Sequence, residues 1–236
     1  PCYFKTNPIM PYRIANSKNN PRPNNRIIFN NGTIITRSIY SKSTIFNYLE
    51  YCKMNEEINH YDHGIVGGLW LYDSLVENYY LSFSRNKFAN FNDFYVDDLH
   101  FSITQFPIFA YLADCIISHN MWFATDDYTI EQYEKYGLKQ LTPPYAQPVQ
   151  FNRNPILFIL ALADTLEPIK TCSNLDISPL DVLNNIECEF NHKQITLAFK
   201  NNDMFNKMTD KINRSTNWLD INVHINNKNN DIFVIF

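Results

Sequence analysis

Three ionisable side chains interrupt otherwise apolar stretches of the sequence. His63 stands in "DHGIVGG", His119 follows "AYLADCIIS", and Asp164 lies inside "LFILALADTL". A buried imidazole or carboxylate is costly unless it is hydrogen-bonded, paired with a charge or bound to a metal ion. Imidazole nitrogen and carboxylate oxygen are both ligands for divalent metals, so together the three residues indicate a metal site. Taken singly, each also fits a hydrogen-bonded residue of a helical core, and that alternative stays open.

Glycines gather beside the first of these residues. Three of the five glycines in the chain are Gly64, Gly67 and Gly68. A glycine inside a helix costs about 0.8–1 kcal/mol relative to alanine, so three together require a steric or functional reason. Gly67 lies one helical turn beyond His63 and on the same side, where it leaves space above the imidazole for an ion, a water or a substrate. Close crossing of a second helix is the alternative reason.

The elements that must position these residues are predicted to be helices. Apolar residues recur at helical spacing over about 41–80, and Asp62 is a candidate cap for the helix that carries His63. A second helix begins at Pro107 and places Cys115 and His119 on one face. A third, almost wholly apolar helix carries Asp164 and stops near Pro168. The stretch before Pro107 is a connector of no clear type, and 124–153 is predicted to be a loop.

The two ends of the chain have a different pattern. "RIIFNNGTIIT" predicts a β-hairpin around Asn31-Gly32. From about 185 the pattern predicts two strands, an amphipathic helix and two further strands. We therefore expect a mainly α fold in three parts: an irregular arm with a β-hairpin (1–40), a helical domain (41–180) and a small C-terminal α+β domain (181–236).

Composition excludes several classes of function. A net charge of -4 and a pI near 5.9 give no electrostatic footprint for DNA or RNA. No apolar run approaches the roughly 20 residues needed to span a bilayer. The five cysteines are odd in number and show no C-x-x-C pair, which is typical of reduced thiols in a cytoplasmic protein.

The order of the three motifs resembles that of the HD-domain metal-dependent phosphohydrolases. "DHGIVGG" (62–68) is similar to their first motif, "AYLADCIISHNMW" (110–122) to the helix with the His-Asp doublet, and "LFILALADTLEP" (157–168) to the helix with the final aspartate. The resemblance covers about residues 45–170. It implies an HD-like helical bundle, a divalent ion (Mn, Mg, Fe, Ni or Zn) and hydrolysis of a phosphate ester, often of a nucleotide.

Carried over residue by residue, the resemblance implies that His63, His119 and Asp164 bind the metal. Asp164 is a candidate for catalysis as well. His60 is an alternative ligand in the first motif. The family commonly has another histidine one turn later, where this chain has Gly67.

The doublet also departs from the family, because Asn120 follows the histidine in place of aspartate. An asparagine amide offers a neutral oxygen but no negative charge, which weakens metal affinity and disfavours a two-metal site. Asp62 could replace the lost carboxylate, or orient His63 through a hydrogen bond. Asp62 and Asn120 are therefore the remaining candidates for catalytic roles.

Other residues are weaker candidates for chemistry. His100 could reach the site but fits a surface histidine better, and Cys115 fits an inert buried thiol. Arg153 and Lys170 flank the Asp164 helix and could meet a phosphate, although solvated helix-end charges are the simpler interpretation. Glu167 could act as an acid or base, or cap the chain before Pro168.

Two functions follow from these residues. The first is a metal-dependent phosphohydrolase of the HD type, with a phosphorylated small molecule or nucleotide as substrate. The second is a non-catalytic HD-like module that binds a nucleotide or a protein, because Asn120 and Gly67 both depart from the family pattern. In either case the C-terminal domain is a candidate surface for homo-oligomerisation.

Overall fold

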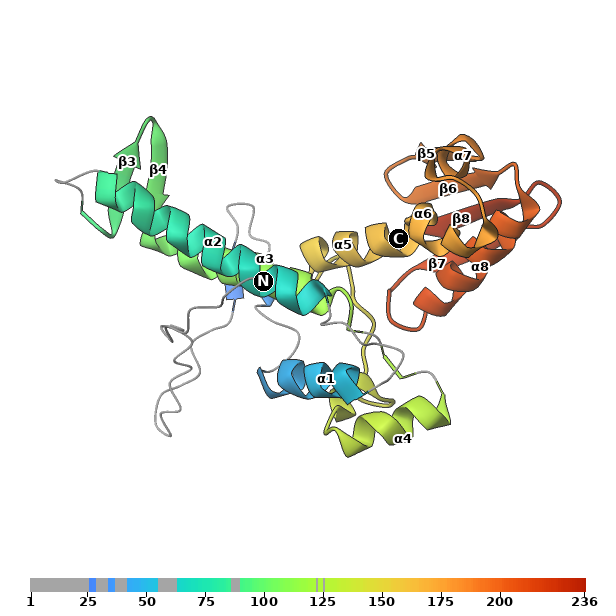
Figure 1. Cartoon of the computed structure of the whole chain (residues 1–236), viewed down its shortest axis with the longest axis horizontal. Helices are drawn as coiled ribbons and strands as arrows, with labels where there is room; N and C mark the ends of the chain where they lie inside the picture. Colours follow the sequence, from blue (N-terminus) through green and yellow to red (C-terminus); the bar gives the residue numbers. More distant parts are fainter. Residues whose placement is uncertain are drawn as a thin grey trace.

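Two long helices lie side by side and form an arm (Figure 1). They are α2 (His63–Arg85) and α3 (Phe106–Ser118) in the computed structural model of the chain. The structure describes residues 26–28, 34–36, 42–54, 63–85, 90–121, 123–124 and 126–236. The chain reverses at the outer end of the arm, between the end of α2 and the start of α3. The first residue of α2 and the last turn of α3 therefore meet at its inner end.

A β-hairpin closes the outer end of the arm. β3 (Asp93–Val96) pairs with β4 (Leu99–Ser102), with Val96 opposite Leu99. The two turn residues, Asp97 and Asp98, have φ values of 48° and 64°. A two-residue hairpin turn with both φ positive usually contains glycine, but aspartate tolerates this conformation better than most residues. The missing glycine is why this connector carried no clear sequence signal.

An aromatic cluster attaches the hairpin to α2. The Tyr79 side chain is fully buried, and its hydroxyl donates a hydrogen bond to the carbonyl of Phe91 at 2.5 Å. Four rings surround it with edge-to-face geometry, at centroid distances of 4.9–6.0 Å: Phe91, Phe94, Phe101 and Phe106. The hairpin is thus held by ring packing around one tyrosine.

A pair of shorter helices lies beside the inner end of the arm. α1 (Lys42–Met54) contacts α4 (Asp127–Lys135) through Tyr51 and Tyr133, whose ring centroids lie 4.8 Å apart. The prediction of a loop over 124–153 was wrong at α4. The Asp126 carboxylate accepts a hydrogen bond from the backbone N–H of Thr129 and so caps this helix.

The third predicted helix is α5 (Pro155–Leu166), which ends two residues before Pro168 as expected. After Glu167 a short helix follows, α6 (Pro168–Thr171), and then α7 (Pro179–Asn184). Three 3₁₀ turns complete the helical elements among the described residues: η1 (Ile103–Gln105), η2 (Lys139–Leu141) and η3 (Ser173–Leu175).

The C-terminal part has the predicted order of two strands, a helix and two strands. β5 (Ile186–Phe190), β6 (Gln194–Phe199), β7 (Asn222–Asn226) and β8 (Asp231–Ile235) form one antiparallel sheet in the order β5-β6-β8-β7. α8 (Asn202–Ser215) packs on this sheet through Met204, Met208 and Ile212, all fully buried. Alternate residues of β6 and β8 are buried, which is the pattern of a sheet with one face against a core.

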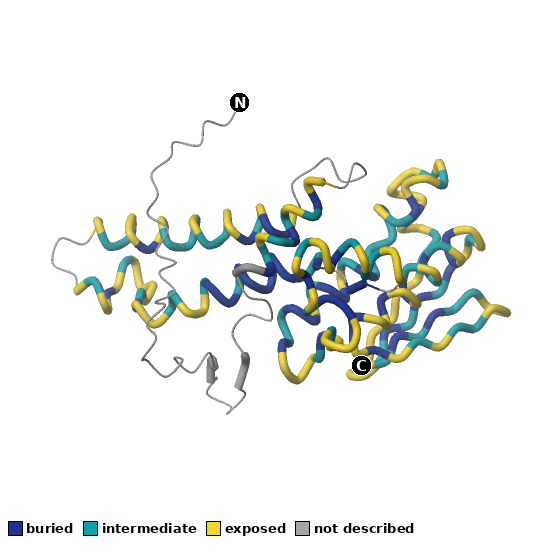
Figure 2. The backbone as a smooth tube through the Cα atoms, turned by 90° about the horizontal axis from the view of Figure 1, so that it is seen from below, coloured by how far each residue is buried: buried dark blue, intermediate teal, exposed yellow. Residues whose placement is uncertain are grey.

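A single hydrophobic core links these parts. It extends from α1 through α3 and α5 to α8 and the four-stranded sheet. Figure 2 shows burial concentrated at this junction, whereas the outer arm is mostly exposed or half-buried. No helix among the described residues is both long and apolar enough to cross a bilayer.

The expectation of a mainly α fold, an HD-like bundle with a small appendage, was wrong. Of the residues that the structure describes, 56% are helical and 18% lie in strands, which is a mixed α/β class. The C-terminal sheet shares its core with the helices, and the β3–β4 hairpin adds strands where none was predicted. The N-terminal hairpin is confirmed, since β1 (Arg26–Ile28) pairs with β2 (Ile34–Thr36). Its turn and the rest of the predicted irregular arm lie outside the described residues.

Candidate metal centre

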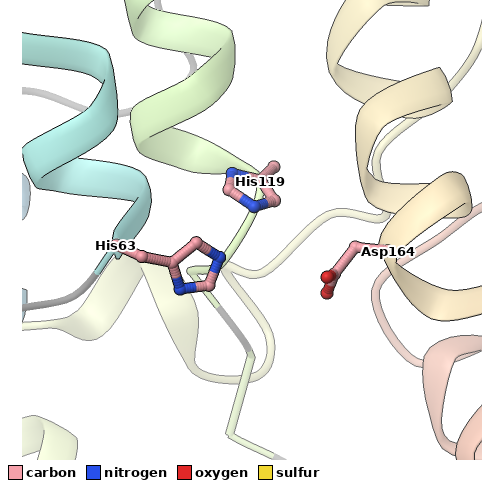
Figure 3. Close-up of side chains that lie close together, drawn as sticks. All are labelled: His63, His119 and Asp164. Carbon is pink, nitrogen blue, oxygen red and sulfur yellow. The ribbon is translucent and has the colours of Figure 1, made fainter. Parts of the chain in front are cut away.

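His63, His119 and Asp164 converge at the inner end of the arm. Each offers one ligand atom, and these atoms all lie within 4.8 Å of one another. The residues come from the first residue of α2, the residue that follows α3, and the last turn of α5. Figure 3 shows the two imidazoles side by side, with the carboxylate of Asp164 turned toward them. Positions up to 101 residues apart in the sequence thus meet in one place.

His119 is held in a defined orientation by the helix that it terminates. Its backbone N–H bonds the carbonyl of Cys115 at 3.1 Å, so the chain is still helical there. Its ring Nδ1 lies 2.5 Å from the carbonyl oxygen of Ile116. A carbonyl only accepts, so Nδ1 carries the proton and donates this bond. In the neutral ring the lone pair then lies on Nε2, which is the tautomer that a metal bound at Nε2 requires.

His63 provides the accessible side of the centre. It is the first residue of α2 and is exposed, while His119 and Asp164 are half-buried. The two rings meet edge to face, with centroids 5.2 Å apart and an interplanar angle of 72°. An incoming molecule can therefore approach from the His63 side.

Asp164 is positioned by packing and by a lysine from the C-terminal part. α5 contacts both α3 and α8, so it bridges the arm and the C-terminal part of the fold. The ammonium of Lys211 on α8 donates to the backbone carbonyl of Asp164 at 2.6 Å. Burial lowers the pKa of the Lys211 ammonium, while the carboxylates of Asp164 and Glu167 act in the opposite direction. The carboxylate of Asp164 thus interacts electrostatically with a cation from α8, whose hydrogen bond goes to the Asp164 backbone.

The donor set fits a divalent transition metal. Two imidazole nitrogens and one carboxylate oxygen suit Zn²⁺, Fe²⁺, Ni²⁺ or Mn²⁺. In a tetrahedral site, two ligand atoms at about 2.1 Å from one ion lie about 3.4 Å apart. The ligand atoms of this group lie within 4.8 Å of one another, so a pair at that limit must close by about 1.4 Å through side-chain movement to share one ion. Three protein ligands leave positions open for water or substrate, as in catalytic rather than structural sites.

Of the predicted site residues next to the two histidines, the structure describes only Asn120. His60 and Asp62, predicted as an alternative ligand and a catalytic carboxylate, lie outside the described residues. Asn120 follows His119 directly and is half-buried. Its backbone carbonyl accepts a hydrogen bond from the hydroxyl of Tyr48 at 3.0 Å, which ties the turn after α3 to α1.

The weaker candidates lie elsewhere or are otherwise engaged. His100 lies in the hairpin at the opposite end of the arm, where it bonds Asp93 at 2.9 Å. Glu167 caps α6 by accepting from the backbone N–H groups of Ile169 and Lys170. Burial raises the pKa of the Cys115 thiol to about 11, as expected of an inert thiol.

Two cations flanking α5 are exposed. Arg153 lies in the turn before α5, and Lys170 lies on α6. Both therefore have the solvated positions that the simpler interpretation predicts for them.

Of the neighbouring glycines Gly67 and Gly68, only Gly68 serves close helix packing. A Cβ built at Gly68 would lie 2.6 Å from the carbonyl oxygen of Ala113 and 2.5 Å from the Ile117 side chain. Gly68 is therefore a point of close approach between α2 and α3. A Cβ at Gly67, to which the sequence assigned the space above His63, would make an ordinary 3.6 Å contact with Ile116. The close contact thus belongs to the neighbouring glycine.

Sequence reasoning missed Lys211 altogether. It lies on an amphipathic helix whose lysines have the spacing of a solvated face, and nothing local indicates a partner 47 residues earlier. Compared with known protein families, curated proteins and solved structures, the chain shows no match. The ligand set and its surroundings are therefore the basis on which a function can be assigned.

Proposed function

We propose that the chain binds one divalent metal ion through His63, His119 and Asp164 and hydrolyses a phosphate ester, in particular that of a nucleotide. The observation that carries the proposal is the convergence of three ligand atoms within 4.8 Å from three separate helices. The order His, His-Asn, Asp along the chain, which resembles that of HD-type phosphohydrolases, supports the choice of phosphate esters.

The charge of the site also favours an anionic substrate. Two neutral imidazoles and one carboxylate leave a divalent ion with a net charge of about +1. Asn120 adds none of the negative charge that an aspartate would bring at this place. When bound, such an ion supplies Lewis-acid catalysis of phosphoryl transfer to water. The exposed His63 leaves the side of approach open, and the Ile116 carbonyl holds His119 in the tautomer that the ion requires.

A second function is favoured by the same asparagine. A site with a single carboxylate binds metal more weakly and assists less in activating water. The chain would then be a non-catalytic module that binds a nucleotide or a partner protein at this end of the arm. This function predicts thermal stabilisation by a nucleotide without turnover.

Metal analysis with matched variants tests the proposal. We expect wild-type protein to take up about one equivalent of metal, and His119→Ala or Asp164→Asn to lose uptake and hydrolysis of a phosphate-ester panel together. His100→Ala is the matched control, because it removes an imidazole from the far end of the arm. Uptake and hydrolysis that survive both substitutions contradict the proposal. Stoichiometric uptake with nucleotide binding but no turnover selects the second function.

A further inference from the structure

The last turn of α5 contains a carbonyl that the helix cannot satisfy. In a continuing helix the carbonyl of Asp164 would accept from the backbone N–H of residue 168. That residue is Pro168, which has no N–H. The chain also leaves the helical conformation at Glu167, where φ is -65° and ψ is 115°. The backbone of a metal-ligand candidate is thus left without its normal hydrogen-bond donor.

Lys211 supplies the missing donor from another part of the fold. Its ammonium donates to the Asp164 carbonyl at 2.6 Å and to the hydroxyl oxygen of Thr171 at 3.0 Å. The Thr171 hydroxyl in turn donates to the carbonyl of Glu167 at 2.8 Å. One half-buried cation therefore joins α8 to both sides of the bend between α5 and α6. A cation at the carboxyl end of a helix is also favoured by the helix dipole.

We propose that Lys211 is a positioning residue of the metal centre, which fixes the final turn of α5 and hence the carboxylate of Asp164. The proposal rests on the proposed function in that Asp164 is taken as a metal ligand. It makes α8, and with it the C-terminal α+β part, a required component of a site whose ligands all lie outside that part. Partners that orient metal ligands are commonly worth 10–100-fold in metal affinity.

A neighbouring lysine provides a matched control. Lys207 lies one turn before Lys211 on the same helix, is also half-buried, and donates to the side chain of Asn174 rather than to α5. Lys207→Met and Lys211→Met remove the same charge and the same donor group from α8. They differ in whether the bond to the Asp164 carbonyl is lost.

The experiment measures the affinity of the full chain for Mn²⁺ and Zn²⁺ by calorimetry. We expect Lys211→Met to weaken metal binding at least tenfold. Lys207→Met should bind metal within about twofold of wild type. Lys211→Arg should recover most of the lost affinity, because it keeps a cationic donor. Hydrogen exchange of the metal-free proteins over 155–166 should be faster in Lys211→Met than in Lys207→Met. This exchange reports the order of the α5 turn independently of metal.

The outcomes separate this proposal from the proposed function. Wild-type affinity in Lys211→Met, or equal exchange in the two methionine variants, overturns the positioning proposal and leaves the metal-dependent function intact. A wild-type protein that takes up neither ion overturns the proposed function, and the assignment of Lys211 to a metal centre falls with it. Loss of hydrolysis with unchanged affinity in Lys211→Met also contradicts a role in holding Asp164.

Discussion

Adjacent glycines on α2 provide a sharp test of how the arm is packed. Gly67→Ala and Gly68→Ala add the same methyl group one residue apart in the same helix. Each replacement gains about 0.8–1 kcal/mol of helix propensity. The environments differ, because the new Cβ meets Ile116 at 3.6 Å from position 67 but the backbone oxygen of Ala113 at 2.6 Å from position 68.

The expected change in the free energy of unfolding follows from these distances. Ordinary contact begins near 3.4 Å, so at position 68 the backbones of α2 and α3 must separate by about 0.8 Å. A backbone oxygen cannot rotate away as a side chain can, and overpacking of this kind costs about 1–3 kcal/mol. Subtracting the propensity gain, we expect Gly68→Ala to destabilise the fold by up to about 2 kcal/mol. Gly67→Ala is expected to stabilise it by up to about 1 kcal/mol.

The difference in the free energy of unfolding between the two variants is measured by urea unfolding of the metal-free proteins, monitored by far-ultraviolet circular dichroism. Movement of α2 away from α3 also separates His63 from His119, so Gly68→Ala is expected to bind metal more weakly than Gly67→Ala. Equal stability of the two variants would refute the close approach at Gly68. A less stable Gly67→Ala would refute the assigned packing altogether.

Two further predictions concern buried groups of the arm. Tyr79→Ala removes the fully buried centre of the ring cluster and is expected to cost about 3–5 kcal/mol in the free energy of unfolding; Tyr79→Phe, which keeps the ring, should cost about 0.5–1.5 kcal/mol. The pKa of the buried Cys115 thiol is about 11 against an ordinary 9.0, so the folded state holds a proton that the unfolded chain releases. The free energy of unfolding should therefore fall as pH rises from about 9 to 11, by on the order of 2 kcal/mol.

Each of these two predictions has its own control. A similar loss in Tyr79→Phe and Tyr79→Ala would contradict the importance of ring packing. For the thiol, stability is measured by urea unfolding at several pH values, and Cys115→Ala should show a shallower decline. Part of the decline is expected to persist, since burial also raises the pKa of Tyr111. An unchanged slope in Cys115→Ala would contradict the assigned cause.

Local patterns were sufficient for the helices that carry the site. Apolar periodicity and Pro107 located α3, and the apolar run ending before Pro168 located α5, because hydrophobic spacing and proline chemistry act within a few residues. The C-terminal order of strands and helix was predictable for the same reason. The β3–β4 hairpin was not, since its turn uses Asp97 and Asp98 in place of glycine. That omission, and the shared core of the sheet, made the mainly α prediction wrong.

The sequence by itself determined which residues could bind a metal and on which helices they lie. It singled out His63, His119 and Asp164 because ionisable groups in apolar stretches need a partner. Only the tertiary structure decided that their ligand atoms approach one another, that Gly68 rather than Gly67 sets the spacing of α2 and α3, and that Lys211 replaces the amide missing at Pro168. The physical reason is the distance along the chain over which each kind of interaction acts. Propensity, periodicity and capping depend on neighbours in the chain, whereas these contacts join helices far apart in sequence and depend on how the whole core packs.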